Sequence, residues 1–358
     1  MKVFFDARMI GHPGIGRYIR CLLSEFKKVK DFELNLLGER KIIEGYPDIN
    51  GNIVDFSYPI YSMQEQIGFL RLKKTLGSSI LHIPHYNIPA LAKFNLVVTI
   101  HDLIHIVYSH GASKKFASIY MKVMIERALK RAEKVICVSN TTKKSLEEIY
   151  GLKNLNIDVI YEGVEKSFFP IKDKHYLLQI KEKYKLPDKF ILYVGSIRRH
   201  KNIDMLLKVL SQLKNKMPDI YLVLVGRFSH ALDLNQKNVL YLGEIPQDQE
   251  LAAIYNLAAC FCNFSFHEGF GLTILEAQKC GIPVVCSNIA THIETGGEGV
   301  LAVNPTDVDQ IEEVLYNVLT NNILRENLIN KGLTNVGRFS WSLAAEKTIE
   351  IYKDAKLH

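Results

Sequence analysis

The chain has 358 residues, of which 47% are hydrophobic and 23% charged, a balance typical of a globular protein large enough for two hydrophobic cores. It has no run of about 18 apolar residues, and its first residues turn polar too early for a signal peptide, so we expect neither a transmembrane helix nor a leader. The formal net charge of +7 favours phosphorylated ligands or an anionic membrane surface; no module that recognises nucleic acid is present.

The cysteines favour a cytoplasmic protein without a metal centre. None of the six has zinc-ligand spacing with histidine partners, and reduced, buried thiols are usual in the cytoplasm. Asp307 and Asp309 form an Asp-x-Asp string in a late loop region. We predict no metal ion and no cofactor.

Short apolar runs alternate with helical patterns in the first half of the chain. The predicted strands cover residues 3–5, 34–37, 80–83, 96–100 and 135–138. The predicted helices cover residues 16–28, 61–76, 114–132 and 141–150. This alternation is typical of a doubly wound parallel sheet.

The alternation starts again after residues 159–170, which we interpret as a crossover. Further elements are predicted at 190–194, 203–214, 221–225, 239–241, 248–257, 258–264 and 282–286, and a helical pattern at 341–353 follows the candidate cap Ser340. We therefore predict an α/β protein with two Rossmann-like domains, residues 1–165 and 166–339, and a terminal helix within 340–358. The ligand site is expected between the domains, at the carboxyl ends of the strands.

A glycine-rich loop follows the first predicted strand and opens a helix. Gly14 and Gly16 would let this loop approach a ligand closely. The spacing differs from the dinucleotide fingerprint G-x-G-x-x-G. A plain turn is the alternative interpretation.

Two histidine-bearing segments follow later strands. His85 and Tyr86, in a loop stiffened by prolines, are candidates to line an acceptor groove, and a rigid structural loop is the alternative. His101 and Asp102 end the strand 96–100, where such folds place ligands, although a capped loop would explain them too. His105 is a further acceptor-binding candidate.

The helix predicted at 114–132 is rich in basic side chains. Through residue 134 its Lys and Arg residues outnumber its acids, Glu126 and Glu133, and apolar residues lie between them. Such a helix can press on anionic lipid. An ordinary half-buried helix with a solvated basic face is the alternative.

A basic loop follows the strand 190–194 and leads into a helix. Gly195, Arg198, Arg199 and Lys201 combine backbone freedom with cations that suit a diphosphate. A solvated basic turn is the alternative. Gly226 ends the next predicted strand and gives a weaker signal.

The most informative segment is residues 266–277, where two carboxylates, Glu268 and Glu276, bracket a glycine-rich turn. A strand, turn and helix in this order offer backbone N–H groups and the positive end of a helix dipole to an anion. Carboxylates on either side can accept hydrogen bonds from hydroxyls. A nucleotide-sugar, with a diphosphate between two polyhydroxylated rings, is such a ligand.

This segment resembles the donor-binding signature of retaining GT-B glycosyltransferases, the large family with two Glu separated by seven residues and Gly-Phe-Gly after the first. The resemblance spans nearly the whole chain and implies two Rossmann-like domains facing across a cleft, with the terminal helix packed on the first. It implies that Glu268 faces the donor sugar and that Glu276 binds the ribose. The turn Gly269, Phe270 and Gly271 and the amides of Leu272 and Thr273 then hold the distal phosphate.

The resemblance assigns the other motifs as well. Gly14 and Gly16 would face the donor phosphates and the acceptor, and Gly226 would border the nucleotide base. His101, with Asp102, would contact the donor sugar. Lys201 and an arginine would bind the diphosphate; many relatives have Arg where this chain has His200, so Arg198 or Arg199 must substitute, and Arg199 is preferred.

The function implied is transfer of a hexose, most simply mannose from GDP-mannose, to a saccharide or lipid-linked saccharide. The expected mechanism is front-face, metal-independent and retaining, with His101, Asp102, Arg199, Lys201 and Glu268 as the catalytic set. Expected partners are the nucleotide-sugar, the acceptor and an anionic membrane at its inner face, but not nucleic acid. UDP- or dTDP-sugar donors, an epimerase or phosphorylase, and a non-catalytic nucleotide-sugar-binding protein are the alternatives.

Overall fold

The computed structural model describes residues 1–29, 32–91, 93–107, 112–151, 156–196, 198–227 and 237–355, with only the backbone described for His105, Val107 and residues 112–117. The chain divides into two compact units. The first combines Met1–Gly163 with Ser340–His358, and the second is Val164–Phe339. Among the described residues, no helix is long and apolar enough to cross a membrane.

The first unit is built on a parallel sheet of seven strands in the order β3-β2-β1-β4-β5-β6-β7. The strands are β1 (Lys2–Asp6), β2 (Glu33–Gly38), β3 (Asn52–Asp55), β4 (Ile80–Ile83), β5 (Asn95–Ile100), β6 (Lys134–Cys137) and β7 (Ile157–Val159). The order reverses between β1 and β4, so the loops after these strands diverge. Ligands of doubly wound sheets bind at such a switch point.

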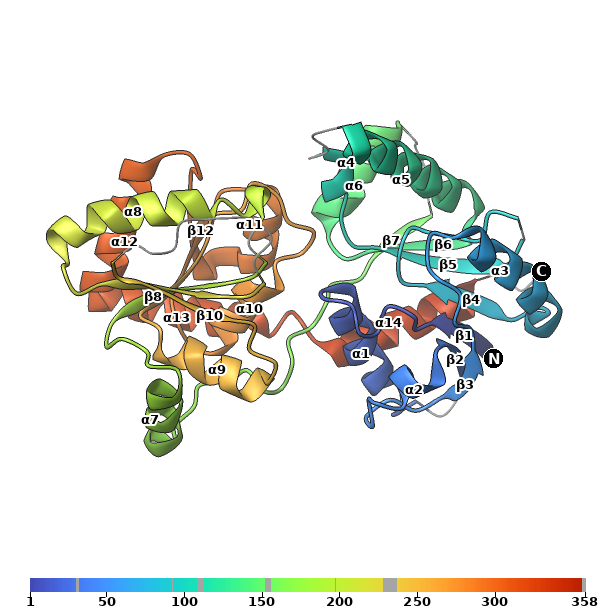
Figure 1. Ribbon diagram of the computed structural model, residues 1–358, viewed down its shortest axis with the longest axis horizontal. Coiled ribbons are helices and arrows are strands. Elements are labelled where there is room, and N and C mark those ends of the chain that lie inside the picture. The colour runs from blue at the N-terminus through green and yellow to red at the C-terminus, as the bar shows by residue number, and fades with distance from the viewer. Residues whose placement is uncertain are drawn as a thin grey trace. The chain divides into compact units, whose positions relative to one another are not determined.

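Helices cover both faces of this sheet, because successive strand residues point to opposite sides. Val3 and Phe5 face one core, under α1 (Ile15–Phe26) and α14 (Trp341–Asp354), whereas Phe4 faces another. That second core is covered by α3 (Met63–Leu76), α5 (Ala112–Arg131) and α6 (Asn140–Tyr150). Two one-turn helices, α2 (Arg40–Ile43) and α4 (Ile104–Val107), lie in the connections (Figure 1).

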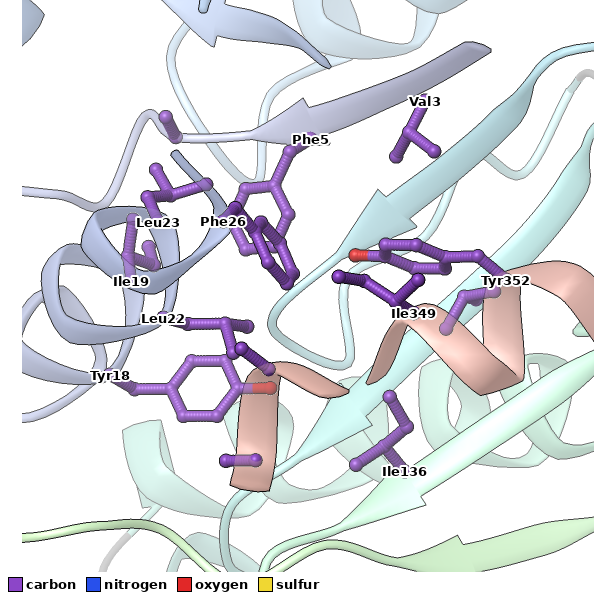
Figure 2. Packing of buried hydrophobic residues seen from close by; sticks show 14 of the residues in the cluster. Val3, Phe5, Tyr18, Ile19, Leu22, Leu23, Phe26, Ile136, Ile349 and Tyr352 are labelled. Atoms are coloured by element: carbon purple, nitrogen blue, oxygen red, sulfur yellow. The ribbon is translucent and has the colours of Figure 1, made fainter. Parts of the chain in front are cut away.

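The terminal helix α14 completes the core of the first unit. Tyr352 and Ile349 point from α14 into the cluster that contains Phe26 of α1 (Figure 2). The Tyr352 hydroxyl lies 2.5 Å from Nδ1 of buried His82, on β4. At the start of α14, Trp341 lies against Gly163, where a Cβ would come within 2.2 Å of the Trp341 nitrogen.

The second unit repeats the plan with six parallel strands in the order β10-β9-β8-β11-β12-β13. The strands are β8 (Phe190–Val194), β9 (Tyr221–Val225), β10 (Val239–Gly243), β11 (Cys260–Asn263), β12 (Val284–Ser287) and β13 (Val300–Val303). The helices are α7 (Lys174–Lys183), α8 (Ile203–Lys216), α9 (Asp248–Leu257), α10 (Leu272–Lys279), α11 (Ala290–Gly296), α12 (Val308–Thr320) and α13 (Asn322–Val336). Its switch point lies between β8 and β11.

The predicted α/β class with two doubly wound parallel sheets is confirmed. The crossover predicted at 159–170 was placed too early, because its first residue, Val159, still belongs to β7. The sequence did not predict β3, β7, β13 or the helices α7, α12 and α13. Asp307 caps α12, accepting a hydrogen bond from the Gln310 amide.

Candidate active site

Two charged side chains meet at the switch point of the second sheet. Lys201 ends the loop after β8, and Glu268 lies in the loop after β11. The Lys201 Nζ donates to both carboxylate oxygens of Glu268, at 2.6 Å each. A backbone hydrogen bond from Phe266 to the His200 carbonyl joins the two loops. The sequence predicted both residues, and the fold brings them together.

Polar neighbours hold the Glu268 carboxylate in one orientation. Ser265 Oγ donates to Glu268 Oε1 at 2.7 Å, and Asn263 Nδ2 lies 3.3 Å from the same oxygen. Burial alone would raise the pKa of Glu268, but the charges of Lys201 and His292 and the hydrogen bonds lower it to about 2. Glu268 is therefore an anion at neutral pH and can accept hydrogen bonds from a ligand.

The glycine turn after Glu268 presents the start of α10. Gly271 has φ +98°, in the left-handed region that favours glycine. Among the described residues, no acceptor is found for the amides of Leu272 and Thr273, which begin α10. These amides and the helix dipole make a local anion site. The Phe270 ring instead packs against Phe339, with ring centroids 5.7 Å apart, and anchors the turn.

Glu276 lies on α10 and is fully buried. Tyr255, on α9, donates its hydroxyl to Glu276 Oε2 at 2.9 Å. The second carboxylate of the signature is thus held inside the unit.

The basic loop after β8 presents its arginines to solvent. Arg198 and Arg199 are exposed, and neither guanidinium has a partner among the described residues.

Gly195 and Gly226 lie in contact at the carboxyl ends of β8 and β9. A Cβ on Gly226, whose φ is +134°, would come within 2.0 Å of the Gly195 carbonyl oxygen, so this close approach of the two loops requires glycine at position 226.

In the first unit, His101 follows β5 and is hydrogen-bonded through both ring nitrogens. Nε2 lies 3.1 Å from the Pro84 carbonyl and Nδ1 lies 3.3 Å from Glu162 Oε1. The neighbouring Asp102 accepts a hydrogen bond from the Ile104 amide at the start of α4. Asp102 therefore has a local structural role, whatever it contributes to a ligand.

The other predicted residues of the first unit differ in accessibility. His85 is buried, with Nε2 3.5 Å from Asp6 and Nδ1 accepting from the Asn87 amide, whereas Tyr86 is half-buried. His105 lies in α4, but its side chain is outside the described residues.

The two glycines of the glycine-rich loop differ in exposure. Gly14, with φ +78°, is exposed and caps α1, whereas Gly16 is buried. A Cβ on Gly16 would come within 2.4 Å of the Ile10 carbonyl oxygen, so this position needs glycine for close packing.

Several polar residues at these switch points were missed by the sequence analysis. In the first unit, Arg8 donates to both Asp6 and Glu65, and all three side chains are buried. Asn263 and Ser265, which contact Glu268, were also missed, although Asn263 ends β11 and Ser265 follows it closely. The contacts of Arg8 with Glu65 and of His101 with Glu162 join residues 57 and 61 positions apart, which no local pattern reveals.

A pocket opens at the carboxyl ends of β1, β2 and β3. Its volume is about 180 Å³, and Ile42, Phe56 and Tyr58 supply apolar walls beside Arg8 and Glu39. Pockets of mixed lining at this edge of a doubly wound sheet are typical ligand sites.

Two family profiles match this chain. Residues 14–168 match the family described as Glycosyltransferase Family 4, and residues 178–334 match Glycosyl transferases group 1. The chain is 28% identical over 386 residues to O-antigen chain mannosyltransferase B of Escherichia coli, covering 99% of this chain and 100% of that relative. It is 29% identical over 283 residues to the serotype-specific mannosyltransferase WbdA of Escherichia coli, covering 75% of this chain but only 34% of WbdA, about a third of its length.

The fold is shared with solved glycosyltransferase structures. Sucrose-phosphate synthase from Thermosynechococcus elongatus superposes with a TM-score of 0.77 at 19% identity, covering 99% of this chain and 98% of the other. One profile matches the first half of the chain and the other matches the second half. The resemblance at Glu268 and Glu276 indicates the same family. The chain belongs to the GT-B glycosyltransferases, and it is a glycosyltransferase with a family 4 domain followed by a group 1 domain.

Proposed function

We propose that the protein transfers mannose from GDP-mannose to a hydroxyl of a saccharide or lipid-linked saccharide, with retention of the anomeric configuration. The observation that carries this proposal is the Lys201–Glu268 pair together with the amides of Leu272 and Thr273, for which the described part of the chain offers no acceptor. Together they offer a cation, an anion-binding helix start and a hydrogen-bond acceptor for a sugar hydroxyl. The names of the O-antigen mannosyltransferase relatives support mannose and polysaccharide assembly.

The chemistry proposed is front-face substitution. The bond from the anomeric carbon to the diphosphate oxygen breaks while the acceptor oxygen bonds on the same face. The departing oxygen takes the acceptor proton, so no protein nucleophile is needed. Lys201, Arg199 and the amides at the start of α10 stabilise the charge that develops on the diphosphate, and Glu268 and His101 orient the sugar.

We further propose that catalysis needs no metal ion, since these cations and amides can neutralise the diphosphate. Lys201 must then exchange part of its contact with Glu268 for the donor. An anionic Glu268 released in this way can accept from a sugar hydroxyl, which links donor binding to sugar orientation.

The acceptor is proposed to be presented at an anionic membrane. The outward face of α3 carries Met63 and Ile67, exposed by 71% and 45%, near Arg71 and Lys74. The outward face of α5 likewise carries Ile119, Val123 and the exposed Lys122 and Lys130. Apolar and basic side chains on one face are typical of helices that lie on anionic lipid.

The test is a set of thermal-shift and donor-hydrolysis assays on the full chain with GDP-mannose, UDP-glucose, UDP-GlcNAc and dTDP-rhamnose, each with and without EDTA. A ligand bound by the folded state alone raises the melting temperature. We expect a shift and hydrolysis with GDP-mannose that EDTA leaves unchanged. A response to another donor would correct the base or sugar, and loss of hydrolysis in EDTA would overturn the metal-free mechanism.

The same assay decides whether Arg198 or Arg199 contacts the diphosphate. Arg199→Ala is expected to reduce donor turnover at least ten times more than Arg198→Ala, because Arg199 lies in the same 3-10 turn as Lys201 (Arg199–Lys201), whereas Arg198 precedes that turn. The opposite ranking would assign the diphosphate contact to Arg198.

A further inference from the structure

Three tyrosine rings gather at the switch point of the first sheet. Tyr61 precedes α3, Tyr86 follows β4 and Tyr120 lies on α5. The centroid of the Tyr61 ring lies 6.0 Å from that of Tyr86 and 6.2 Å from that of Tyr120. Tyr61 and Tyr120 remain 50% and 41% exposed. These three residues are called the tyrosine cluster here: Tyr61 and Tyr120 present aromatic surface to solvent, whereas Tyr86 is half-buried and packs against the core.

The backbone at Tyr61 is held in a costly conformation. Its φ is +67°, a region that aromatic residues rarely adopt. The Tyr61 amide donates to Glu65 Oε2 at 2.9 Å, which stabilises this conformation. Such outliers persist where the surrounding structure enforces them, and they concentrate at ligand sites.

A buried polar network fixes the cluster from behind. Glu65 and Asn87 are fully buried, and Asn87 Nδ2 donates to Glu65 Oε2 at 2.7 Å. Asn87 Oδ1 accepts from the Tyr120 hydroxyl at 2.5 Å, and Arg8 donates to Glu65 Oε1 at 2.7 Å. Burying this many polar groups is costly unless each is paired. Here the hydrogen bonds hold the exposed rings of Tyr61 and Tyr120 in fixed positions. Packing of the hydrophobic core does not require exposed rings to be fixed in this way.

The surroundings of the cluster suit an uncharged polyhydroxylated ring. Burial raises the pKa of each of the three phenols, so the hydroxyls stay protonated; that of Tyr120 already donates to Asn87 Oδ1, and its oxygen can accept. The charge of Glu65, which is paired with Arg8, and that of Asp102 also raise pKa values in the cluster, while Arg127 lowers the pKa of Tyr120. Aromatic faces bury the C–H face of a pyranose, and phenolic hydroxyls pair with its hydroxyls.

We propose that the tyrosine cluster binds the terminal sugar ring of the acceptor, with Tyr61 as the main stacking surface and Glu65 and Asn87 as positioning residues. His101, which follows β5, lies 3.1 Å through Nε2 from the carbonyl oxygen of Pro84, two residues before Tyr86, so the cluster is close to the carboxyl end of β5. The inference rests on the proposed transfer to a saccharide. It adds two residues, Tyr61 and Tyr120, that the sequence did not single out.

The test compares Tyr61→Ala, Tyr61→Phe and the matched control Tyr176→Ala, whose tyrosine lies on α7 in the second unit. Methyl α-D-mannopyranoside serves as a soluble acceptor for transfer from GDP-mannose. Y61A is expected to raise the acceptor KM tenfold or more while donor hydrolysis without acceptor stays unchanged. The acceptor KM of Y61F, which keeps the ring, should stay within threefold of the wild-type value. The acceptor KM of Y176A should equal the wild-type value.

Direct binding separates this proposal from the proposed function. Saturation-transfer NMR of methyl α-D-mannopyranoside with the full-length protein is expected to show contact in wild type and Y61F, but not in Y61A. Absence of donor turnover in wild type would refute the proposed function alone, since this binding can still be measured. Unchanged sugar binding and acceptor KM in a folded Y61A would overturn the tyrosine cluster proposal. So would a Y61A defect confined to binding of anionic vesicles, which would assign the cluster to lipid.

Discussion

Lys201 and Glu268 depend on each other for charge and position. Lys201 donates to both Glu268 oxygens, so in the proposed mechanism the donor phosphate and Glu268 share one cation. We expect Lys201→Ala to lower turnover of GDP-mannose by about 10²- to 10³-fold, the usual effect of removing one group that stabilises transition-state charge. Steady-state hydrolysis rates provide the measurement, and Lys208→Ala, an exposed lysine on α8, is the control. Equal rates in the two variants would contradict the assignment.

The low pKa of Glu268 predicts how stability depends on pH. The folded pKa of about 2 lies below the ordinary 4.5, so this carboxylate stabilises the fold above about pH 4.5 and loses that effect as pH falls towards 2. Between pH 7 and pH 3 its contribution should fall by about 2 kcal/mol. Urea unfolding of wild type and Glu268→Gln at both pH values tests this.

In that comparison, the variant should lose less stability than wild type on acidification. Glu313→Gln, which changes an exposed carboxylate on α12, should behave like wild type. Parallel losses in wild type and Glu268→Gln would show that Lys201 does not hold the carboxylate charged in solution.

At the scale of elements, the start of α14 packs so closely on Gly163 that this position requires glycine. A Cβ on Gly163 would lie 2.2 Å from the Trp341 nitrogen and 2.7 Å from the Ser340 carbonyl carbon, both of them backbone atoms. We expect Gly163→Ala to destabilise the protein by about 1–3 kcal/mol, as overpacking usually does. Chemical denaturation measures it. Gly11→Ala, where a Cβ would come no closer than 3.7 Å to a neighbour, should be neutral.

The elements that sequence reasoning found are those with strong local signals. Strands β1, β5 and β8 are apolar runs at the centre of a parallel sheet, buried on both faces. By contrast, β3 is a short edge strand with Asn52 and Asp55 at its ends, and β7 has only Ile157–Val159. Such strands form because a neighbour supplies the hydrogen bonds, which a single segment does not reveal.

The same reasoning explains which site residues could be predicted. Lys201 and Glu268 each follow a strand with a strong local signal, and the sheet order, in which β8 lies beside β11, brings them together. The burial of His85 and the meeting of Tyr61 with Tyr120 depend instead on packing between segments distant in the chain. No periodicity or spacing encodes those contacts.

At the scale of the whole molecule, the net charge of +7 and the outward faces of α3 and α5 predict reversible binding to anionic lipid. The full chain should sediment with vesicles containing phosphatidylglycerol but not with pure phosphatidylcholine. In 1 M salt, where the Debye length is about 3 Å, binding should weaken strongly. Lys122→Glu should lower the partition coefficient about fivefold or more, since one basic residue near the surface contributes about 1 kcal/mol.

Apolar contact is tested separately from charge, because the two contributions respond to different changes. Met63→Ser with Ile67→Ser should reduce vesicle binding at low salt without changing donor hydrolysis in solution, as neither side chain lies among the proposed donor contacts. Ile323→Ser, which replaces an equally apolar side chain exposed by 82% on α13, is the matched control and should bind like wild type. If the double substitution leaves vesicle binding unchanged but 1 M salt abolishes it, the membrane contact is only a general attraction between a basic protein and an acidic surface. Loss in both experiments would mean that α3 inserts its apolar face and that the acceptor is met at the lipid surface.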